Sequence, residues 1–419
     1  MREFMDYVHS AFYEATGWRR DNSYAALNAT SHALLDFQTP RGLRLTLSSL
    51  ASSNFATSYQ LGSVGVVDGS ISYLFSSVPL RVHLTPQSED VPLPDLLRAY
   101  RPLAPLSAED ETSVRTLPGA ARPQSSLLYG RLYLPQSRLE ALVVRRLSPA
   151  LQLQLSAVSA QHLRHGGTVL GLAQYDVGRC ALEGLASSDG GLLGLRGIYN
   201  FGGDAHPSPA AEAASRGEKE RIYGRFSTGG EIYYGTLNKS GGISLGTRFA
   251  TLPAHRGTPL SATLTINPLM GNVAASYAVV AGKHCSLATR LEFNVFSYES
   301  AWAVGMELWR KPLRRLGVEA RRPWETYKER SLEAKLEWRL DEPEPVPVAP
   351  AELSAVADKR KRGDEYAGVL KARLDQNMRI GILWEGRVKS LLFSLGSGID
   401  LRRLDKPFRT LGMEVQFSS

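Results

Sequence analysis

The C-terminal end of the chain alternates between apolar and other residues with a period of two. The apolar positions are Leu411, Met413, Val415 and Phe417, and the positions between them are Gly412, Glu414 and Gln416. Successive side chains of a β-strand point to opposite faces, so the apolar residues would share one side. The last strand of a transmembrane β-barrel closes the sheet and faces hydrocarbon on one side, so the pattern favours a barrel.

The same alternation begins at Gly42 and recurs along the chain, which predicts a long series of short strands. Clear examples lie at residues 43–48, 151–156, 286–295, 332–340 and 378–384. Setting aside about forty N-terminal residues and three irregular stretches leaves roughly fifteen residues for each strand and turn of about nineteen strands. Strand length and number therefore permit an all-β transmembrane barrel over residues 41–419.

Residues 1–40 have a helical period instead. Apolar side chains recur at helical spacing from Phe4 to Ala15, and Gly17 is expected to end this amphipathic helix. A second, weaker helix is predicted within residues 24–37, before Pro40. The acidic residues of the segment argue against a cleavable mitochondrial presequence, so we expect it to be retained.

Three stretches lack strand periodicity, namely residues 82–125, 203–220 and 341–364. Prolines break the first and the third, and we expect all three to be loops or linkers. The glycine-rich run from Gly190 to Gly203 lacks the strand, helix and lysine context of a phosphate-binding loop. It is predicted to be a turn between strands.

Composition excludes membrane-spanning helices but not a barrel. Of the 419 residues, 43% are hydrophobic, and no stretch reaches the ~18 to 20 consecutive apolar residues that a spanning helix needs. A barrel gives the same average, because alternate residues face water. Cys180 and Cys285 are too few and too far apart for a disulfide framework or a metal site, which fits a reducing or cytosol-facing compartment.

The formal net charge of +8 is compatible with nucleic acid, anionic lipid headgroups or a lumen that attracts acidic solutes. A dispersed surplus is the simpler interpretation, because only residues 359–362 (KRKR) form a dense basic run. A solvated loop explains this run, with contact to anionic headgroups as the alternative, and we assign it no nucleic-acid role.

No arrangement of catalytic or metal-binding residues stands out. The eight histidines are scattered without a recognisable motif. Glu333 and Glu337 resemble a glycosidase pair only loosely, since Lys335 and Arg339 share their face and indicate a solvated or lumenal charge ladder. We expect no enzyme activity and no cofactor.

Aromatic residues gather near strand ends or within alternating runs. They are Tyr73 with Phe75, Phe296 with Tyr298, and Trp302, Trp309, Trp338 and Trp384. An aromatic girdle at the membrane interface is the favoured interpretation. The alternative is that Tyr73 and Phe75, or Phe296 and Tyr298, bind a partner protein.

Several segments of the chain resemble a known family of proteins. They are MREFMDYVHSAFYEATGW at the N-terminus, DNSYAALNATS, TPRGLRLTLSSL, NFATSY, GVVDGSISYLFSS and the C-terminal TLGMEVQF. With them the chain resembles the mitochondrial distribution and morphology protein 10 family, fungal outer-membrane barrels of the ER–mitochondria encounter structure. The resemblance covers both ends of the chain and little between residues 82 and 220.

The resemblance implies a mitochondrial outer-membrane barrel of about nineteen strands, related to the voltage-dependent anion channel, with the N-terminal helix inside or against the wall. Thr410, Gly412, Val415 and Phe417 match the sorting signal of the family. The implied partners are cytosolic lipid-transfer proteins and an ER-membrane subunit of a tether, membrane lipids, and the sorting and assembly machinery for other barrels. The implied role is tethering and support of phospholipid exchange at ER contact sites.

Two other functions stay open. A metabolite or protein-conducting outer-membrane pore would have the same architecture. A soluble all-β binding protein would share the alternation of its solvent-facing strands.

Overall fold

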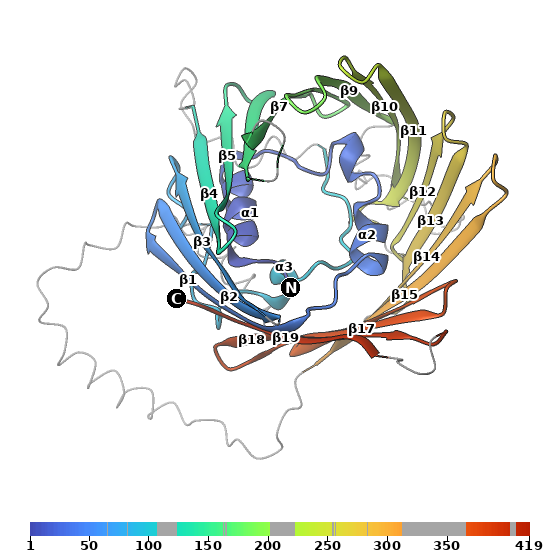
Figure 1. Ribbon diagram of the computed structural model, residues 1–419. Coiled ribbons are helices and arrows are strands. Elements are labelled where there is room, and N and C mark those ends of the chain that lie inside the picture. The colour runs from blue at the N-terminus through green and yellow to red at the C-terminus, as the bar shows by residue number, and fades with distance from the viewer. Residues whose placement is uncertain are drawn as a thin grey trace, which may run out of the picture.

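The computed structural model describes residues 1–419 except 65, 82, 107–123, 162, 164–165, 202–222, 254, 256, 283, 312–365 and 403–407. Within this described part, 19 strands form one sheet that closes on itself (Figure 1). The predicted all-β barrel of about nineteen strands with an N-terminal helix is thereby confirmed. Among the described residues, no helix is long and apolar enough to cross a membrane.

The strands follow one another around the barrel in chain order. They are β1 (Gly42–Ser52), β2 (Phe55–Val64), β3 (Val66–Ser76), β4 (Ser126–Leu134), β5 (Arg138–Arg146), β6 (Leu151–Ser159), β7 (Gly167–Asp176), β8 (Cys180–Ser187), β9 (Leu192–Phe201), β10 (Gly224–Gly235), β11 (Ser240–Thr251), β12 (Leu260–Asn267), β13 (Asn272–Val280), β14 (Cys285–Asn294), β15 (Ser300–Arg310), β16 (Gly368–Asp375), β17 (Arg379–Val388), β18 (Leu391–Asp400) and β19 (Phe408–Ser418). Consecutive strands pair antiparallel, whereas β1 and β19 pair parallel. An odd number of alternating strands requires this, because the first and the last then run in the same direction.

Side chains alternate across the wall as the C-terminal pattern predicts. On β1, Leu43, Leu45 and Leu47 are exposed on the outside, whereas Thr46 and Ser48 are buried on the inside. The outer face is therefore apolar, and the inner face is mostly polar. Buried polar groups need hydrogen-bond partners, so the contents of the lumen, the space enclosed by the barrel, must supply them.

The first helix in the described part, α1 (Phe4–Thr16), lies inside the barrel, with β2 and β3 as its closest strands (Figure 1). It ends at Gly17, whose left-handed φ of 68° suits glycine, as the sequence predicted. Its apolar residues pack on an unusual apolar patch of the inner wall, formed by Leu74, Leu127 and Val144, which are all 0% exposed. Burying each such side chain stabilises docking by about 1.5 to 3 kcal/mol.

The β3–β4 connection, of which residues 77–81 and 83–106 are described, also packs into the lumen. It contains the short helix α3 (Leu93–Leu96), and Leu80, Leu93 and Leu97 are fully buried in the same cluster as α1. The Leu96 carbonyl accepts a hydrogen bond of 2.9 Å from the Arg2 backbone amide. The sequence indicated an irregular loop here, and the structure shows that this loop fills space inside the barrel.

The second half of the N-terminal segment crosses the lumen to the opposite wall (Figure 1). It forms the 3-10 helix η1 (Tyr24–Ala26) and the helix α2 (Ala29–Leu35). Leu34 and Leu35 pack on Ala278, Ala288 and Ala303, which present small side chains from β13, β14 and β15. Small wall residues allow close contact here, because the α2 backbone lies directly on the strands.

Two sequence predictions were wrong in part. Only Gly190 and Gly191 of the described part of the Gly190–Gly203 run form a turn, with φ of 64° and 59°, and Leu192–Phe201 form β9. Trp309 faces the lumen and packs against Tyr366 with ring centroids 5.0 Å apart, so it is not part of an outer girdle. Trp302 and Trp384 do face outward.

Other predictions lie outside the described residues. They concern the strand at 332–340 with its charge ladder and Trp338, the loops at 203–220 and 341–364, and the basic run at 359–362.

The close approach of α2 predicts that Gly305 tolerates no side chain. A methyl group there would lie 2.8 Å from both the Leu34 carbonyl oxygen and a methyl carbon of Leu35. We expect Gly305→Ala to cost about 1 to 3 kcal/mol by overpacking. Gly242→Ala is the matched control, since a methyl on that inner-wall glycine meets nothing within 4 Å. Thermal unfolding of the purified barrels measures this cost as a lower midpoint for Gly305→Ala. Equal unfolding midpoints for the two variants would contradict the prediction.

Candidate functional site

The four predicted sorting-signal residues lie together on β19, with two on each face. Thr410 and Gly412 face the lumen, and Val415 and Phe417 face outward next to Leu45 and Leu47 of β1. The seam, defined as the parallel β1–β19 pair, runs from Gly42 opposite Gly412 to Ser48 opposite Ser418. The structure thus places all four predicted signal residues on a strand of the junction where the barrel closes.

The end of the seam near the C-terminus is fastened from inside. The Ser88 backbone amide donates a hydrogen bond of 3.1 Å to the Ser418 carbonyl. Arg387 of β17 donates hydrogen bonds to the Ser88, Glu89 and Val91 carbonyls at 3.2, 2.7 and 2.7 Å. The β3–β4 connection is therefore bound to β17 and β19 at the point where the last strand ends. No local pattern in the sequence indicates these contacts, because their partners are about 300 residues apart.

A buried charge cluster fixes the start of the N-terminal segment. The Met1 ammonium forms an ion pair with Glu385, which also lies 2.9 Å from the Lys371 ammonium. Lys371 donates a hydrogen bond of 2.6 Å to the Arg98 carbonyl, and Glu307 is buried beside this group. The cluster joins the N-terminal segment, the β3–β4 connection and the wall at β15 to β17. Removing one partner of such a buried pair leaves an uncompensated charge, so the three parts are held together.

A polar belt crosses the inner wall from β6 to β10. Gln152 donates to Gln174 at 3.2 Å, Gln174 donates to Glu183 at 2.8 Å, and Arg196 bridges Glu183 and Glu231 at 3.8 and 3.2 Å. These five residues are neighbours in the register of successive strands. The belt keeps this part of the wall hydrophilic.

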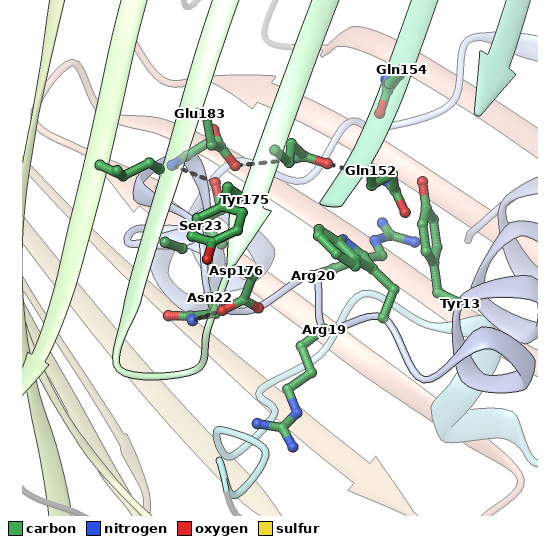
Figure 2. A pocket seen from close by; sticks show the side chains of 16 residues that line it. Tyr13, Arg19, Arg20, Asn22, Ser23, Gln152, Gln154, Tyr175, Asp176 and Glu183 are labelled. Carbon is green, nitrogen blue, oxygen red and sulfur yellow. Dashed lines mark hydrogen bonds between the residues drawn. The ribbon is translucent and has the colours of Figure 1, made fainter. Parts of the chain in front are cut away.

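A cavity of about 260 Å³ separates the belt from the N-terminal segment. Tyr13, Arg20 and Asn22 line it opposite Gln152, Asp176 and Glu183, whereas the Arg19 guanidinium points away from them and donates to the Leu106 carbonyl (Figure 2). Asn22 closes one side, where its amide donates to Asp176 at 2.6 Å and to the Gly178 carbonyl at 2.9 Å. The described residues contain no group of three His, Cys, Asp or Glu side chains that could hold a metal ion.

The structure separates the two predicted aromatic pairs. Tyr73 and Phe75 lie on the outer face of β3 near its C-terminal end, beside Phe55. Phe296 and Tyr298 lie in the β14–β15 turn and are 67% and 81% exposed. Since β3 and β15 run in the same direction, this turn is at the opposite end of the barrel. The pairs therefore do not form one surface, and a partner-binding role of each stays a prediction.

A closed 19-stranded β-barrel, whose lumen holds its own N-terminal segment and a long connection, is the class of protein that this geometry defines. The family described as Mitochondrial distribution and morphology protein 10 matches residues 1–419. The chain belongs to this family, as its sequence resemblance indicated.

Relatives with this same description are similar over nearly the whole chain. The protein of Chaetomium globosum is 61% identical over 95% of this chain and 99% of its own length. Those of Podospora anserina and Neurospora crassa are 57% and 56% identical over the full length of both chains.

Burial of His9 makes docking of α1 dependent on pH. The pKa of His9 is lowered from 6.5 to about 4, chiefly by burial and also by the nearby Arg20, against the opposite effect of Asp6. Its ring packs edge-on against Tyr129 at 5.6 Å, and its Nε2 atom is buried without a hydrogen-bond partner. The docked helix therefore favours the neutral imidazole.

We expect docking to weaken as pH falls through the window from 6.5 towards 4, because the undocked segment takes up the proton first. The free energy of docking at pH 5 is expected to be less favourable than at neutral pH by on the order of 2 kcal/mol. Hydrogen exchange of residues 1–41 in the purified barrel, compared at neutral pH and pH 5, measures it. His9→Phe should remove the difference, and an equal pH response of this variant and the original chain would contradict the assignment.

Proposed function

We propose that this chain is the mitochondrial outer-membrane barrel subunit of a tether between the ER and mitochondria. Membership of the family over all 419 residues is the observation that carries the proposal. The closed wall with an apolar outer face supports membrane insertion, because the described sheet has no free edge that would expose unpaired backbone groups to hydrocarbon. Cytosolic lipid-transfer proteins and an ER-membrane subunit would be its partners, and phospholipid exchange at the contact site the process it supports.

We further propose that the chain joins the sorting and assembly machinery that matures outer-membrane barrels. A strand with two outward apolar residues and an inward glycine is suited to edge pairing with another sheet. Its role in both assemblies would be positional, with no chemistry on a substrate.

A pore for metabolites or polypeptides is the second candidate. The polar belt favours it, because a water-filled path needs hydrophilic walls. The N-terminal segment and the β3–β4 connection argue against a pore, since they occupy space in the lumen that a solute would cross. Conductance of the purified barrel in planar bilayers would support the pore.

Affinity purification of the intact complex from fungal mitochondria tests the tether. We expect the original chain to retain both groups of partners, and recovery of neither would refute the proposal. Tyr73→Ala with Phe75→Ala is expected to lower partner recovery severalfold if this pair is a docking site. Tyr199→Ala with Phe201→Ala is the matched control, because this pair has similar exposure, the same spacing and the same end of the barrel on β9. Equal recovery with both variants would leave Tyr73 and Phe75 as girdle residues.

Substitutions in the sorting signal are expected to prevent insertion into the membrane. Phe417→Ala removes an outward side chain at the seam, and Gly412→Ala places a methyl group on its inner face. Extraction of imported chains with alkaline carbonate should release both variants. Phe293→Ala is the control, since Phe293 faces outward on β14 away from the seam. Normal integration of both signal variants would refute the role of these residues.

A further inference from the structure

The chain passes from the lumen into the wall directly over the last two strands. Thr39, Pro40 and Arg41 connect α2 to β1, and they lie on the inner face of β18 and β19. The Thr39 hydroxyl is 3.1 Å from the Thr410 hydroxyl. This crossing ends at Gly42, the first residue of the seam, which pairs with Gly412.

Two glycines make the crossing possible. Gly396 of β18 and Gly412 of β19 are direct partners in the sheet and both face the lumen. A methyl group at Gly396 would lie 2.5 Å from Cδ of Pro40, and one at Gly412 would lie 2.7 Å from Cα of Arg41. A real Cβ atom does not approach non-bonded carbon atoms this closely, so the two glycines form a notch in the wall that fits the Thr39–Arg41 backbone.

The segment docked in the notch covers the inward-facing half of the predicted sorting signal. Thr410 and Gly412, its polar and glycine positions, face inward and contact Thr39 and Pro40. Val415 and Phe417, its two apolar positions, stay on the outside. In the finished barrel, the inner half of the signal is therefore occupied by the chain's own N-terminal segment.

We propose that docking of Thr39–Arg41 into the Gly396–Gly412 notch completes the seam and releases the last strand from the assembly machinery. This inference rests on the proposed association with that machinery. It assigns a positioning role to Gly396, which lies outside the signal, and to Pro40.

The coupling follows from chain continuity. β1 starts one residue after Arg41, so docking of the crossing and pairing of Gly42 with Gly412 bring adjacent residues into place. β1 then pairs with the free edge of β19, and Thr39 and Pro40 pack on the inner face of β19. A protein bound to β19 at that edge or face loses both surfaces in the same step. A methyl group at Gly396 would block docking without changing any signal residue.

Import of the radiolabelled full-length chain into isolated fungal mitochondria tests the proposal. The fraction bound to the assembly machinery is followed over time on native gels. Gly396→Ala should bind at the original rate and remain bound severalfold longer. Gly242→Ala should behave like the original chain, because its inner-wall methyl meets no atom within 4 Å.

A second substitution separates blocked docking from general misfolding. Pro40→Ala removes Cδ and Cγ, the two side-chain atoms nearest to the position of the new methyl group at Gly396. Combined with Gly396→Ala it should restore release, as a compensating pair does in a double-mutant cycle. Lack of rescue would overturn the proposal.

The remaining outcomes are equally decisive. Release of Gly396→Ala at the original rate would overturn the inference, and so would a loss of its initial binding, since Gly396 would then act in recognition. If the original chain never binds the machinery, the proposed association itself fails. That result is distinguishable, because it is seen without any substitution.

Discussion

The structure depends on closing a sheet that has no free edge. An edge strand exposes a row of unpaired amide and carbonyl groups, and each such group costs several kcal/mol in a hydrocarbon environment, roughly 4 to 8 in the strictest comparison. Eighteen antiparallel junctions form between strands that are neighbours in sequence, but the parallel seam joins the two ends of the chain. The seam is therefore the junction with the greatest loop-closure cost, and the contacts on its inner face stabilise it against that cost.

The contents of the lumen supply those contacts. Thr39 and Pro40 cover the seam near the start of β1. At the end near the C-terminus, Ser88 hydrogen-bonds to β19 and is itself held by Arg387. The charge cluster of Met1, Lys371 and Glu385 ties the same segments to the neighbouring strands. The N-terminal segment and the β3–β4 connection thus belong to the closure of the wall as much as to the filling of its interior.

The inner wall is matched to these segments residue by residue. Apolar side chains face inward where α1 docks, alanine and glycine where α2 lies on the strands, and hydrogen-bonded polar residues along the belt. A uniform polar lining would leave the apolar faces of the helices uncovered. The same division favours an anchoring barrel over an open pore, because two internal segments are held by specific contacts at both ends.

In the described strands with clear alternation, such as β1, β6 and β19, the sequence by itself determined which side faces outward, because side-chain alternation is a local property with a period of two. It also determined α1 and its end at Gly17, and it placed the four predicted signal residues on the closing strand. Tertiary structure decided what the lumen holds. Arg387 and Val91, or Pro40 and Gly412, meet across some three hundred residues or more, and no local period encodes such contacts. Trp309 and Gly396 show the same limit, since a tryptophan suits either face of a strand and a glycine suits a turn as well as a notch, until the opposing segment is in place.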